Sequence, residues 1–157
     1  MILVTVGTQL PFDRLVAAMD AIAADLGEPV MAQIGVTSYG PRHLDWASTL
    51  SPVKFDAAIA SARLLVSHAG TGSILAAQSH RIPVILMPRR ADLGEHRNDH
   101  QLATVAGLAG RPGLYVANDA DELAALVRRT DLVPAENAAQ LPSRRQLIGN
   151  LQAYLNA

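Results

Sequence analysis

The sequence predicts an α/β fold: a parallel sheet of five or six strands in Rossmann-like order, with helices on both faces. Short apolar runs of strand length alternate along the chain with segments whose apolar residues recur at helical spacing. The runs are continuously apolar rather than alternating with polar residues, which is typical of strands buried on both faces. The length of 157 residues suits one domain, expected to span residues 1–157.

Five apolar runs are the expected strands. In a sheet of this kind ligands bind beyond the carboxyl ends of the strands, so the residues that follow each run are the candidates for a site. In chain order the runs are residues 2–6, 30–34, 64–66, 84–87 and 114–116.

Helices are expected between the runs. Over residues 12–26 the apolar side chains recur at the spacing of about 3.6 residues that marks a helix face. Another helix is expected over residues 102–109, ending near Gly110, and a further one after Asp119, where Glu122 completes a start like a capping box. A last apolar stripe predicts a C-terminal helix through Leu147, Ile148, Leu151, Tyr154 and Leu155.

The composition narrows the function classes. The net charge is −1 without a long block of like charge, so bulk attraction to nucleic acid or anionic lipid is not expected. The chain has no cysteine, which excludes disulfides and thiolate chemistry and fits a reducing cytoplasm. No apolar run approaches the roughly 20 residues that cross a bilayer, and the first residues are typical of a strand rather than a signal peptide. Any membrane association is therefore expected through a surface or a partner.

The first two predicted strands end in different ways. After the first, Gly7 allows a sharp turn, and Thr8 and Gln9 offer side-chain hydrogen bonds to a ligand; a plain strand-to-helix turn is the alternative. After the second, Gln33 lies inside the apolar run and Gly35 ends it, and an ordinary loop is expected there.

The third predicted strand runs into SHAGTGS, a string of small hydrogen-bonding residues that opens a helix. Free backbone N–H groups at a helix N-terminus and the helix dipole favour an anion, and glycines let a phosphate approach the main chain. The string is not a dinucleotide fingerprint, because Leu75 replaces the third glycine, and it is not a Walker A loop. It predicts a diphosphate site, with a capped helix start that binds nothing as the alternative. The candidates are Ser67, His68, Gly70, Thr71, Gly72 and Ser73.

The fourth predicted strand is followed by PRRADLGEHRNDHQLA, the densest polar stretch of the chain. Carboxylates and amides hold sugar hydroxyls, so a polyhydroxylated ligand is expected here, with a solvated loop as the alternative. A metal site is a weak alternative, because no His-x-x-x-His pair sits on an established helix face with a glutamate base; no metal is expected. Arg89 and Arg90 would suit the carboxylate of a uronic acid, or equally a phosphate, an anionic lipid or a partner.

Three strings together resemble the C-terminal domain of family 28 glycosyltransferases. They are VTVGTQLPFDRLV, SHAGTGSILAA and PVILMPRRADLGEHRNDHQLA, and the resemblance runs from the first residue to about residue 126. It is closest to the short stand-alone form of that domain. This form includes the catalytic subunit of the eukaryotic two-part UDP-N-acetylglucosamine transferase, and bacterial exopolysaccharide and capsule proteins that work with a membrane-bound subunit. The resemblance implies the C-terminal half of a GT-B glycosyltransferase, which binds the nucleotide-sugar.

The resemblance also implies roles for individual residues. Gly7, Thr8 and the loop of residues 67–73 would face the donor diphosphate. Many relatives carry a ribose-binding glutamate where this chain has Ala76, so ribose is held otherwise, through Gln78 or a backbone group, or the nucleotide binds more weakly. The residues expected near the donor sugar are Asn98, Asp99, His100 and Gln101, with Glu95 as a further candidate; Arg89 is a substrate-binding candidate on its charge alone.

The implied reaction moves a hexose or hexuronic acid from a UDP-sugar to a lipid-linked saccharide, with inversion, in polysaccharide biosynthesis. N–H donors at the helix start would stabilise the leaving UDP without metal or cofactor. The chain would be the donor-binding subunit of a two-component transferase, at the inner face of the membrane through an anchored partner. That partner, rather than His68 or His100, is expected to supply the general base. A non-catalytic nucleotide-binding or scaffolding subunit is the alternative, and the missing dinucleotide fingerprint argues against an oxidoreductase.

Overall fold

Six short strands form one parallel sheet in the computed structural model, which describes residues 1–136. The strands are β1 (Ile2–Thr5), β2 (Val30–Gln33), β3 (Asp45–Ala47), β4 (Leu64–His68), β5 (Val84–Met87) and β6 (Leu114–Val116). The helices are α1 (Asp13–Ala23), α2 (Pro52–Ser61), α3 (Thr71–His80), α4 (His100–Leu108) and α5 (Ala120–Val127), with a 3₁₀ turn at Ala91–Leu93.

The strand order is β3-β2-β1-β4-β5-β6. Every pairing is parallel, and β1 lies between β2 and β4. The chain extends the sheet from β1 to β3 on one side and then crosses to β4 on the other, so the order reverses between β1 and β4. At such a reversal the two following helices pack on opposite faces and leave a crevice, which is where sheets of this class bind ligands.

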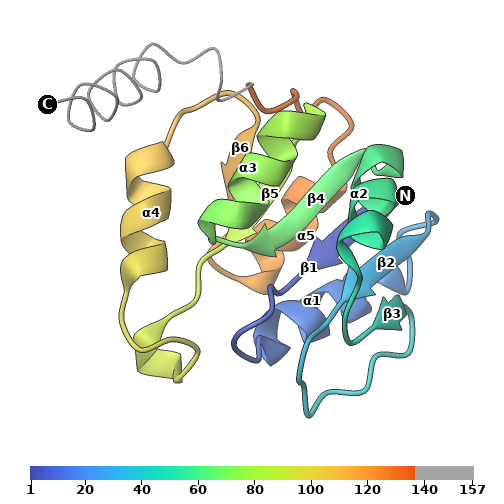
Figure 1. Cartoon of the computed structure of the whole chain (residues 1–157), viewed down its shortest axis with the longest axis horizontal. Coiled ribbons are helices and arrows are strands. Elements are labelled where there is room, and N and C mark those ends of the chain that lie inside the picture. The colour runs from blue at the N-terminus through green and yellow to red at the C-terminus, as the bar shows by residue number, and fades with distance from the viewer. Residues whose placement is uncertain (137–157) are drawn as a thin grey trace, which may run out of the picture.

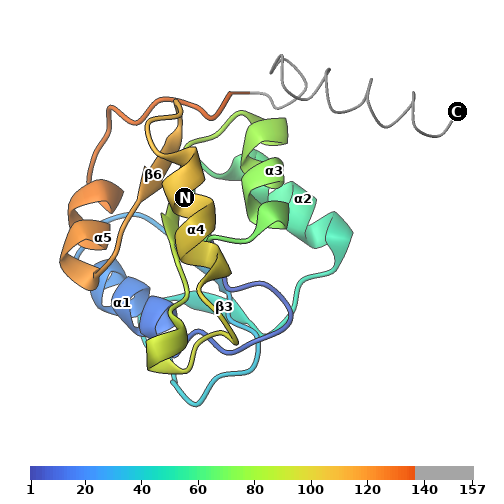
Figure 2. The ribbon, with the colours of Figure 1, turned by 90° about the vertical axis from the view of Figure 1, so that its left-hand side faces the viewer.

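Strand side chains alternate between two core layers. In β1, Ile2 and Val4 belong to the layer that contains the apolar faces of α1 and α5. Leu3 points the other way, into the layer that contains Ile59 of α2, Ile74 of α3 and Val105 of α4. Figure 2 shows α1 and α5 on one side of the sheet and α2 and α3 on the other. The predicted α/β fold with helices on both faces is therefore confirmed.

All five predicted strands are present, and their ends lie within two residues of the expected ones. The start of α5 follows the predicted capping box in part. Asp119 accepts a hydrogen bond from the backbone N–H of Glu122, while the Glu122 carboxylate reaches the backbone N–H of Asn118 rather than that of Asp119. The predicted C-terminal helix lies outside the described residues, and the single domain over residues 1–157 stays a prediction.

Two elements were not predicted, β3 and α2. The strand is a three-residue edge strand whose Asp45 and Trp46 are exposed, so it has no apolar run to mark it. The helix buries only Ala58 and Ile59, which is too narrow an apolar stripe to stand out. The signal that existed was Ser51 before Pro52: the serine side chain caps the helix through the N–H of Lys54, and proline suits the first helical turn.

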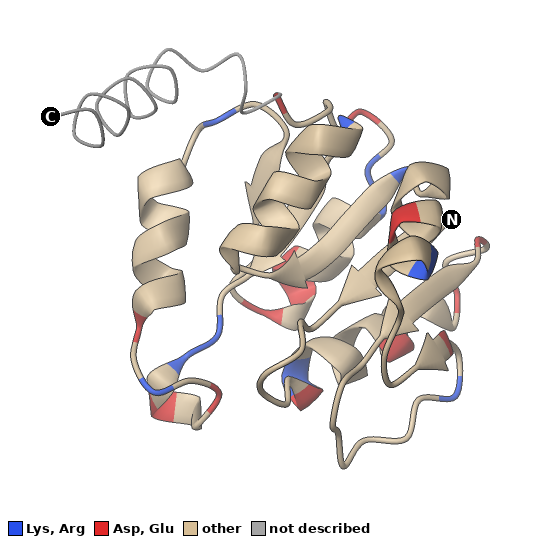
Figure 3. Ribbon diagram, viewed as in Figure 1, with Lys and Arg blue, Asp and Glu red and all other residues tan. Residues whose placement is uncertain are grey.

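Charged residues lie mainly on the helices and loops. Figure 3 shows both signs interspersed, and the segment between β5 and α4 carries several of each. The central strands β1, β4 and β5, which are labelled in Figure 1, contain no Lys, Arg, Asp or Glu. Within residues 1–136 no helix combines the length and the apolar character that a bilayer crossing requires.

Replacing Gly113 with alanine should destabilise the fold by about 3 kcal/mol. Gly113 has a φ of +79°, and a Cβ there would lie 2.2 Å from the N and Cα atoms of Ala135, which packs across the strand start. The matched control is Gly110→Ala, because Gly110 has the same φ of +79° and nothing within 4 Å. Urea denaturation should give a loss of about 1 kcal/mol for this control. Equal losses in the two variants would contradict the packing argument.

Candidate functional site

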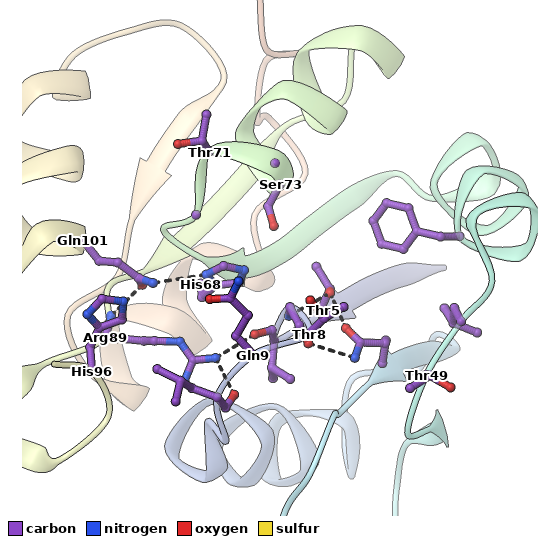
Figure 4. Close-up of a pocket in the computed structure, with 18 of the residues that line it drawn as sticks. Thr5, Thr8, Gln9, Thr49, His68, Thr71, Ser73, Arg89, His96 and Gln101 are labelled. Atoms are coloured by element: carbon purple, nitrogen blue, oxygen red, sulfur yellow. Dashed lines mark hydrogen bonds between the residues drawn. The ribbon is translucent and has the colours of Figure 1, made fainter.

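A cavity of about 600 Å³ opens at the carboxyl edge of the sheet, where the strand order reverses. The loop after β1 and the loop after β4 form two of its walls, with Gly7, Thr8 and Gln9 on one and the start of α3 on the other. The connection between β3 and α2, with the first turn of α2, adds a third wall (Figure 4). The volume lies within the range of small-molecule sites, roughly 300–1,000 Å³.

The start of α3 presents unbonded backbone N–H groups to this cavity. Gly70 is the N-cap residue and, lacking a side chain, makes no cap hydrogen bond. Side-chain oxygens of Ser51 and Asp119 cap α2 and α5, whereas α1 and α4, like α3, have no side-chain cap. The N–H groups of Thr71, Gly72 and Ser73 have no partner within the described chain, and these three residues line the cavity. The helix dipole adds positive potential at this end, so the arrangement suits an anion.

Gly7 and Gly70 enclose the imidazole of His68. A Cβ at Gly7 would lie 2.6 Å from His68 Nε2, and a Cβ at Gly70 would lie 2.1 Å from His68 Cε1. Glycine at these two positions therefore makes room for the histidine ring. At Gly72 a Cβ would meet nothing within 4 Å, so the space beside this residue is open.

Gln101 links His68 to the two neighbouring strand ends. Its Oε1 accepts the backbone N–H groups of Ala69, at 3.1 Å, and Arg89, at 3.0 Å. Its Nε2 lies 3.2 Å from Nδ1 of His68 (Figure 4). Burial, together with electrostatic interactions with Arg89 and His96, lowers the pKa of His68 to about 4, so the ring is neutral at pH 7.

Arg89 holds the loop after β1 in place. Its side chain is buried, and its guanidinium donates to the carbonyl oxygens of Val6 at 2.7 Å, Leu10 at 2.8 Å and Pro11. The same group lies over the Phe12 ring, 4.6 Å from its centroid. Burial lowers the pKa of Arg89, and the nearby Glu95 opposes that shift. The guanidinium therefore organises the backbone of one cavity wall.

Gln33 ties the same loop to the sheet from the other side. Its Oε1 accepts the hydroxyl of Thr5 at 2.6 Å, and its Nε2 donates to the carbonyls of Gly7 and Ser48, both at 3.0 Å. The expectation of an ordinary loop after β2 missed this role. An amide inside a buried apolar run was the available signal, because such a group needs partners.

The family model of the glycosyltransferase family 28 C-terminal domain matches residues 1–147. The chain belongs to this family. No curated protein sequence matches it. The family 28 assignment agrees with the site, since the loops after β1, β4 and β5 carry the three strings that resembled the family.

Solved glycosyltransferases share the fold of this family 28 domain. The kitacinnamycin glycotransferase aligns with a TM-score of 0.61 and 19% identity, over 83% of this chain and 34% of that one. The calicheamicin glycosyltransferase CalG4 aligns with a TM-score of 0.54 and 20% identity, over 83% and 34% of the two chains. The glycosyltransferase VinC, whose structure contains dTDP, aligns with a TM-score of 0.50 and 17% identity, over 82% of this chain and 32% of that one. The family 28 chain therefore spans about a third of the length of these proteins.

The cavity of the family 28 domain brings together most of the residues predicted for phosphate binding. Ser67 is the exception, because it is fully buried and its hydroxyl donates to Ser73 Oγ at 2.7 Å. The predicted residues that line the cavity are Gly7, Thr8, His68, Gly70, Thr71, Gly72, Ser73, Arg89 and Gln101.

Several residues predicted near the donor sugar lie outside the cavity lining. Glu95 forms a two-pronged ion pair with Arg14, at 2.7 and 2.9 Å, and accepts the N–H of Arg90. Asn98, Asp99 and His100 are exposed; Asp99 Oδ1 accepts the N–H of Ala91, and Asn98 Oδ1 that of His100. These contacts shape the loop between β5 and α4.

The arginine pair also has protein partners. Arg89 bonds main-chain carbonyls, and the exposed Arg90 pairs with Asp92 at 2.6 Å. These contacts count against a site in which both guanidinium groups hold a uronic acid. Within residues 1–136 no group of three or more histidine and carboxylate side chains is arranged to hold a metal ion.

Some residues line the cavity although they were not predicted as site residues. His96 comes from the polar loop after β5, Thr49 and Leu50 from the connection between β3 and α2, and Pro52 and Phe55 from the start of α2. The last four were missed because neither β3 nor α2 was predicted. Ala76 packs against the second core layer, and Gln78 is buried away from the cavity lining, so neither contributes to that lining.

The depressed pKa of His68 predicts a loss of stability in weak acid. Between pH 6.5 and about 4 the unfolded chain binds a proton at this residue that the folded protein does not, so the free energy of unfolding falls as the pH falls. The full effect is about 3 kcal/mol across that window. Guanidinium denaturation at pH 7.5, 6.5, 5.5 and 4.5 would measure it. His68→Gln should flatten the curve over this range, and identical slopes for both proteins would contradict the assignment.

Proposed function

We propose that this chain is the donor-binding subunit of a two-component inverting glycosyltransferase. It would take a hexose or hexuronic acid from a UDP-sugar and pass it to a lipid-linked saccharide in polysaccharide biosynthesis. The observation that carries the proposal is the uncapped N-terminus of α3, with the N–H groups of residues 71–73 opening on a cavity where the strand order reverses. Membership of family 28 supports the reaction class.

Different walls of the cavity suit the diphosphate and the base of a nucleoside diphosphate. The amides of α3, the Thr71 hydroxyl and the neutral imidazole of His68 are hydrogen-bonding groups on the phosphate side. Leu50, Pro52 and Phe55 form an apolar wall elsewhere in the cavity, which suits a flat base. The dTDP in VinC supports the ligand class, and the choice of UDP remains part of the proposal.

The proposed chemistry follows from where charge develops. When the bond between sugar and phosphate breaks, the leaving diphosphate gains negative charge. The fixed N–H groups at the start of α3 then bind the diphosphate more strongly in the transition state than in the intact UDP-sugar. This difference lowers the barrier. The amides of residues 71–73 require no reorganisation, because the helix holds them.

The acceptor half would come from a partner. The chain has about a third of the length of the solved transferases that share its fold. A membrane-anchored subunit would present the lipid-linked acceptor and supply the general base. We therefore place the chain at the inner face of the membrane, held there by this partner.

A thermal-shift panel tests the donor class. UDP, UDP-glucose, UDP-glucuronate, GDP-mannose and dTDP-glucose would each be added to the purified chain. A ligand that binds only the native state raises the melting temperature, by an amount set by its concentration relative to its Kd. UDP compounds should give the largest shifts. If none of the nucleotides raised the melting temperature, either with the partner or without it, the proposal would be refuted.

A non-catalytic nucleotide-binding subunit is the second candidate, and Ala76 together with the position of Asn98, Asp99 and His100 outside the cavity lining favours it. Membranes from cells that co-express the chain and its partner would be given radiolabelled UDP-sugar. Transfer to lipid that is lost in a Gly70→Ala variant supports the transferase. Transfer that is unchanged in this variant supports the non-catalytic role, and full transfer by the chain alone contradicts the two-component arrangement.

A further inference from the structure

Gln101 lies where three parts of the site meet, and it uses both ends of its amide. It is the second residue of α4 and is 7% exposed. Its Oε1 receives two backbone N–H groups, from Ala69 after β4 and from Arg89 after β5. Its Nε2 faces Nδ1 of His68 at 3.2 Å (Figure 4).

These contacts determine which nitrogen of His68 carries the proton. Backbone N–H groups only donate, so the Gln101 atom that meets two of them must be the oxygen. The other end is therefore the amide NH₂, which only donates. His68 Nδ1 must accept this hydrogen bond and is unprotonated. In a neutral imidazole the proton then lies on Nε2.

We infer that Gln101 is a positioning residue that holds His68 as its Nε2–H tautomer, so that His68 presents a fixed hydrogen-bond donor to an oxyanion in the cavity. The part that concerns the oxyanion rests on the proposed function, whereas the tautomer does not.

Nε2 of His68 is open to the cavity. Within residues 1–136, every buried side-chain nitrogen or oxygen has a hydrogen-bond partner. Nε2 of His68 has no partner there, so it is not one of these buried atoms. Nε2 is therefore accessible from the cavity that His68 lines. The ring cannot turn away, because Gly7 and Gly70 enclose it closely enough that neither position has room for a Cβ. The direction of the donor is thus set by the backbone on both sides.

The same arrangement prevents His68 from acting as a general base. A base must direct a lone pair at the acceptor hydroxyl, whereas Nε2 carries a proton and the lone pair of Nδ1 is engaged by Gln101. Arg89 and His96 are the charged and titratable groups that act on His68, and with burial they lower its pKa to about 4. His68 is therefore a neutral donor at pH 7, and the base lies elsewhere.

Long-range ¹H–¹⁵N correlation spectra of the ligand-free protein, labelled with ¹⁵N-histidine, test the tautomer directly. The chain has five histidines, and a His68→Gln variant assigns the signal. We expect the Nε2–H pattern for His68 at pH 7, unchanged down to about pH 5. An Nδ1–H pattern or an imidazolium at pH 7 would overturn the inference.

Gln101→Glu tests whether the amide sets this state. The carboxylate can still accept the N–H groups of Ala69 and Arg89, but it cannot donate to Nδ1. We expect Nδ1 to become protonated and the pKa of His68 to rise by more than about one unit. UDP affinity at pH 8 should fall about tenfold, because an unprotonated Nε2 would then face the phosphate. An unchanged Nε2–H pattern with unchanged titration would refute the role of Gln101.

Gln101→Met is the second variant, for use if the glutamate variant does not fold. Methionine has a similar length but neither accepts nor donates effectively, so His68 should show both tautomers in exchange. A single Nε2–H pattern in this variant would refute the role of Gln101. The two proposals remain distinguishable, because a wild-type protein that shows the Nε2–H pattern but does not bind UDP would refute the proposed function alone.

Discussion

Gly70→Ala should weaken UDP binding at least about a hundredfold, the largest effect on binding that we expect from one methyl group. The new Cβ would lie 2.1 Å from Cε1 of His68, and the ring is confined on its other side by Gly7. The imidazole must therefore leave its place, which removes the Nε2–H donor and distorts the backbone at the start of α3. Isothermal titration calorimetry with UDP measures the change.

The matched control for Gly70→Ala is Gly107→Ala. Gly107 lies inside α4, and a methyl group added there would meet nothing within 4 Å, so alanine should raise helix stability by about 0.5–1 kcal/mol. UDP affinity should stay at the wild-type value in this control. Wild-type affinity in Gly70→Ala, with the protein folded, would contradict the role given to the enclosed histidine.

Arg89→Met should lower the free energy of unfolding by about 4 kcal/mol, the largest stability effect that we expect in the site. Methionine fills much of the space but leaves the carbonyls of Val6, Leu10 and Pro11 without their donor in a buried setting. The loop after β1 should loosen, so UDP affinity should fall as well. Urea denaturation with a calorimetric titration measures both effects.

The neighbouring residue provides the control for this prediction. Arg90 is exposed and pairs with Asp92 on the surface, so Arg90→Met should leave the free energy of unfolding close to the wild-type value. If Arg89→Met and Arg90→Met had equal effects, the structural role of the buried guanidinium would be refuted.

The sheet was predictable because its central strands are buried on both faces. Leu64, Leu65 and Val66, for example, need apolar side chains on every position, and such a run stands out in the sequence. The anion site after β4 was predictable for a similar reason, since glycines and hydroxyl residues at a helix start have a local physical meaning. Both features depend on residues that are neighbours in the chain.

The connections between the loops were not predictable from local sequence. Arg89 lies more than 70 residues from the carbonyls it holds, and Gln101 lies more than 30 residues from His68. In the sequence both belong to a polar stretch that equally suits a sugar site or a solvated loop. Only the strand order, which puts the ends of β1, β4 and β5 together, reveals that these side chains support the cavity walls.

The most direct test of the anion site is a titration of the ¹⁵N-labelled chain with UDP, compared with uridine and followed by amide ¹H–¹⁵N spectra. The account predicts that UDP, but not uridine, shifts the amide signals of Thr71, Gly72 and Ser73 most strongly, since these N–H groups would bind the phosphates. At the capped start of α2, the amide signal of Lys54 should shift less, because this N–H already donates to the Ser51 side chain. Saturable UDP shifts that leave the α3 amides unchanged would contradict the central claim.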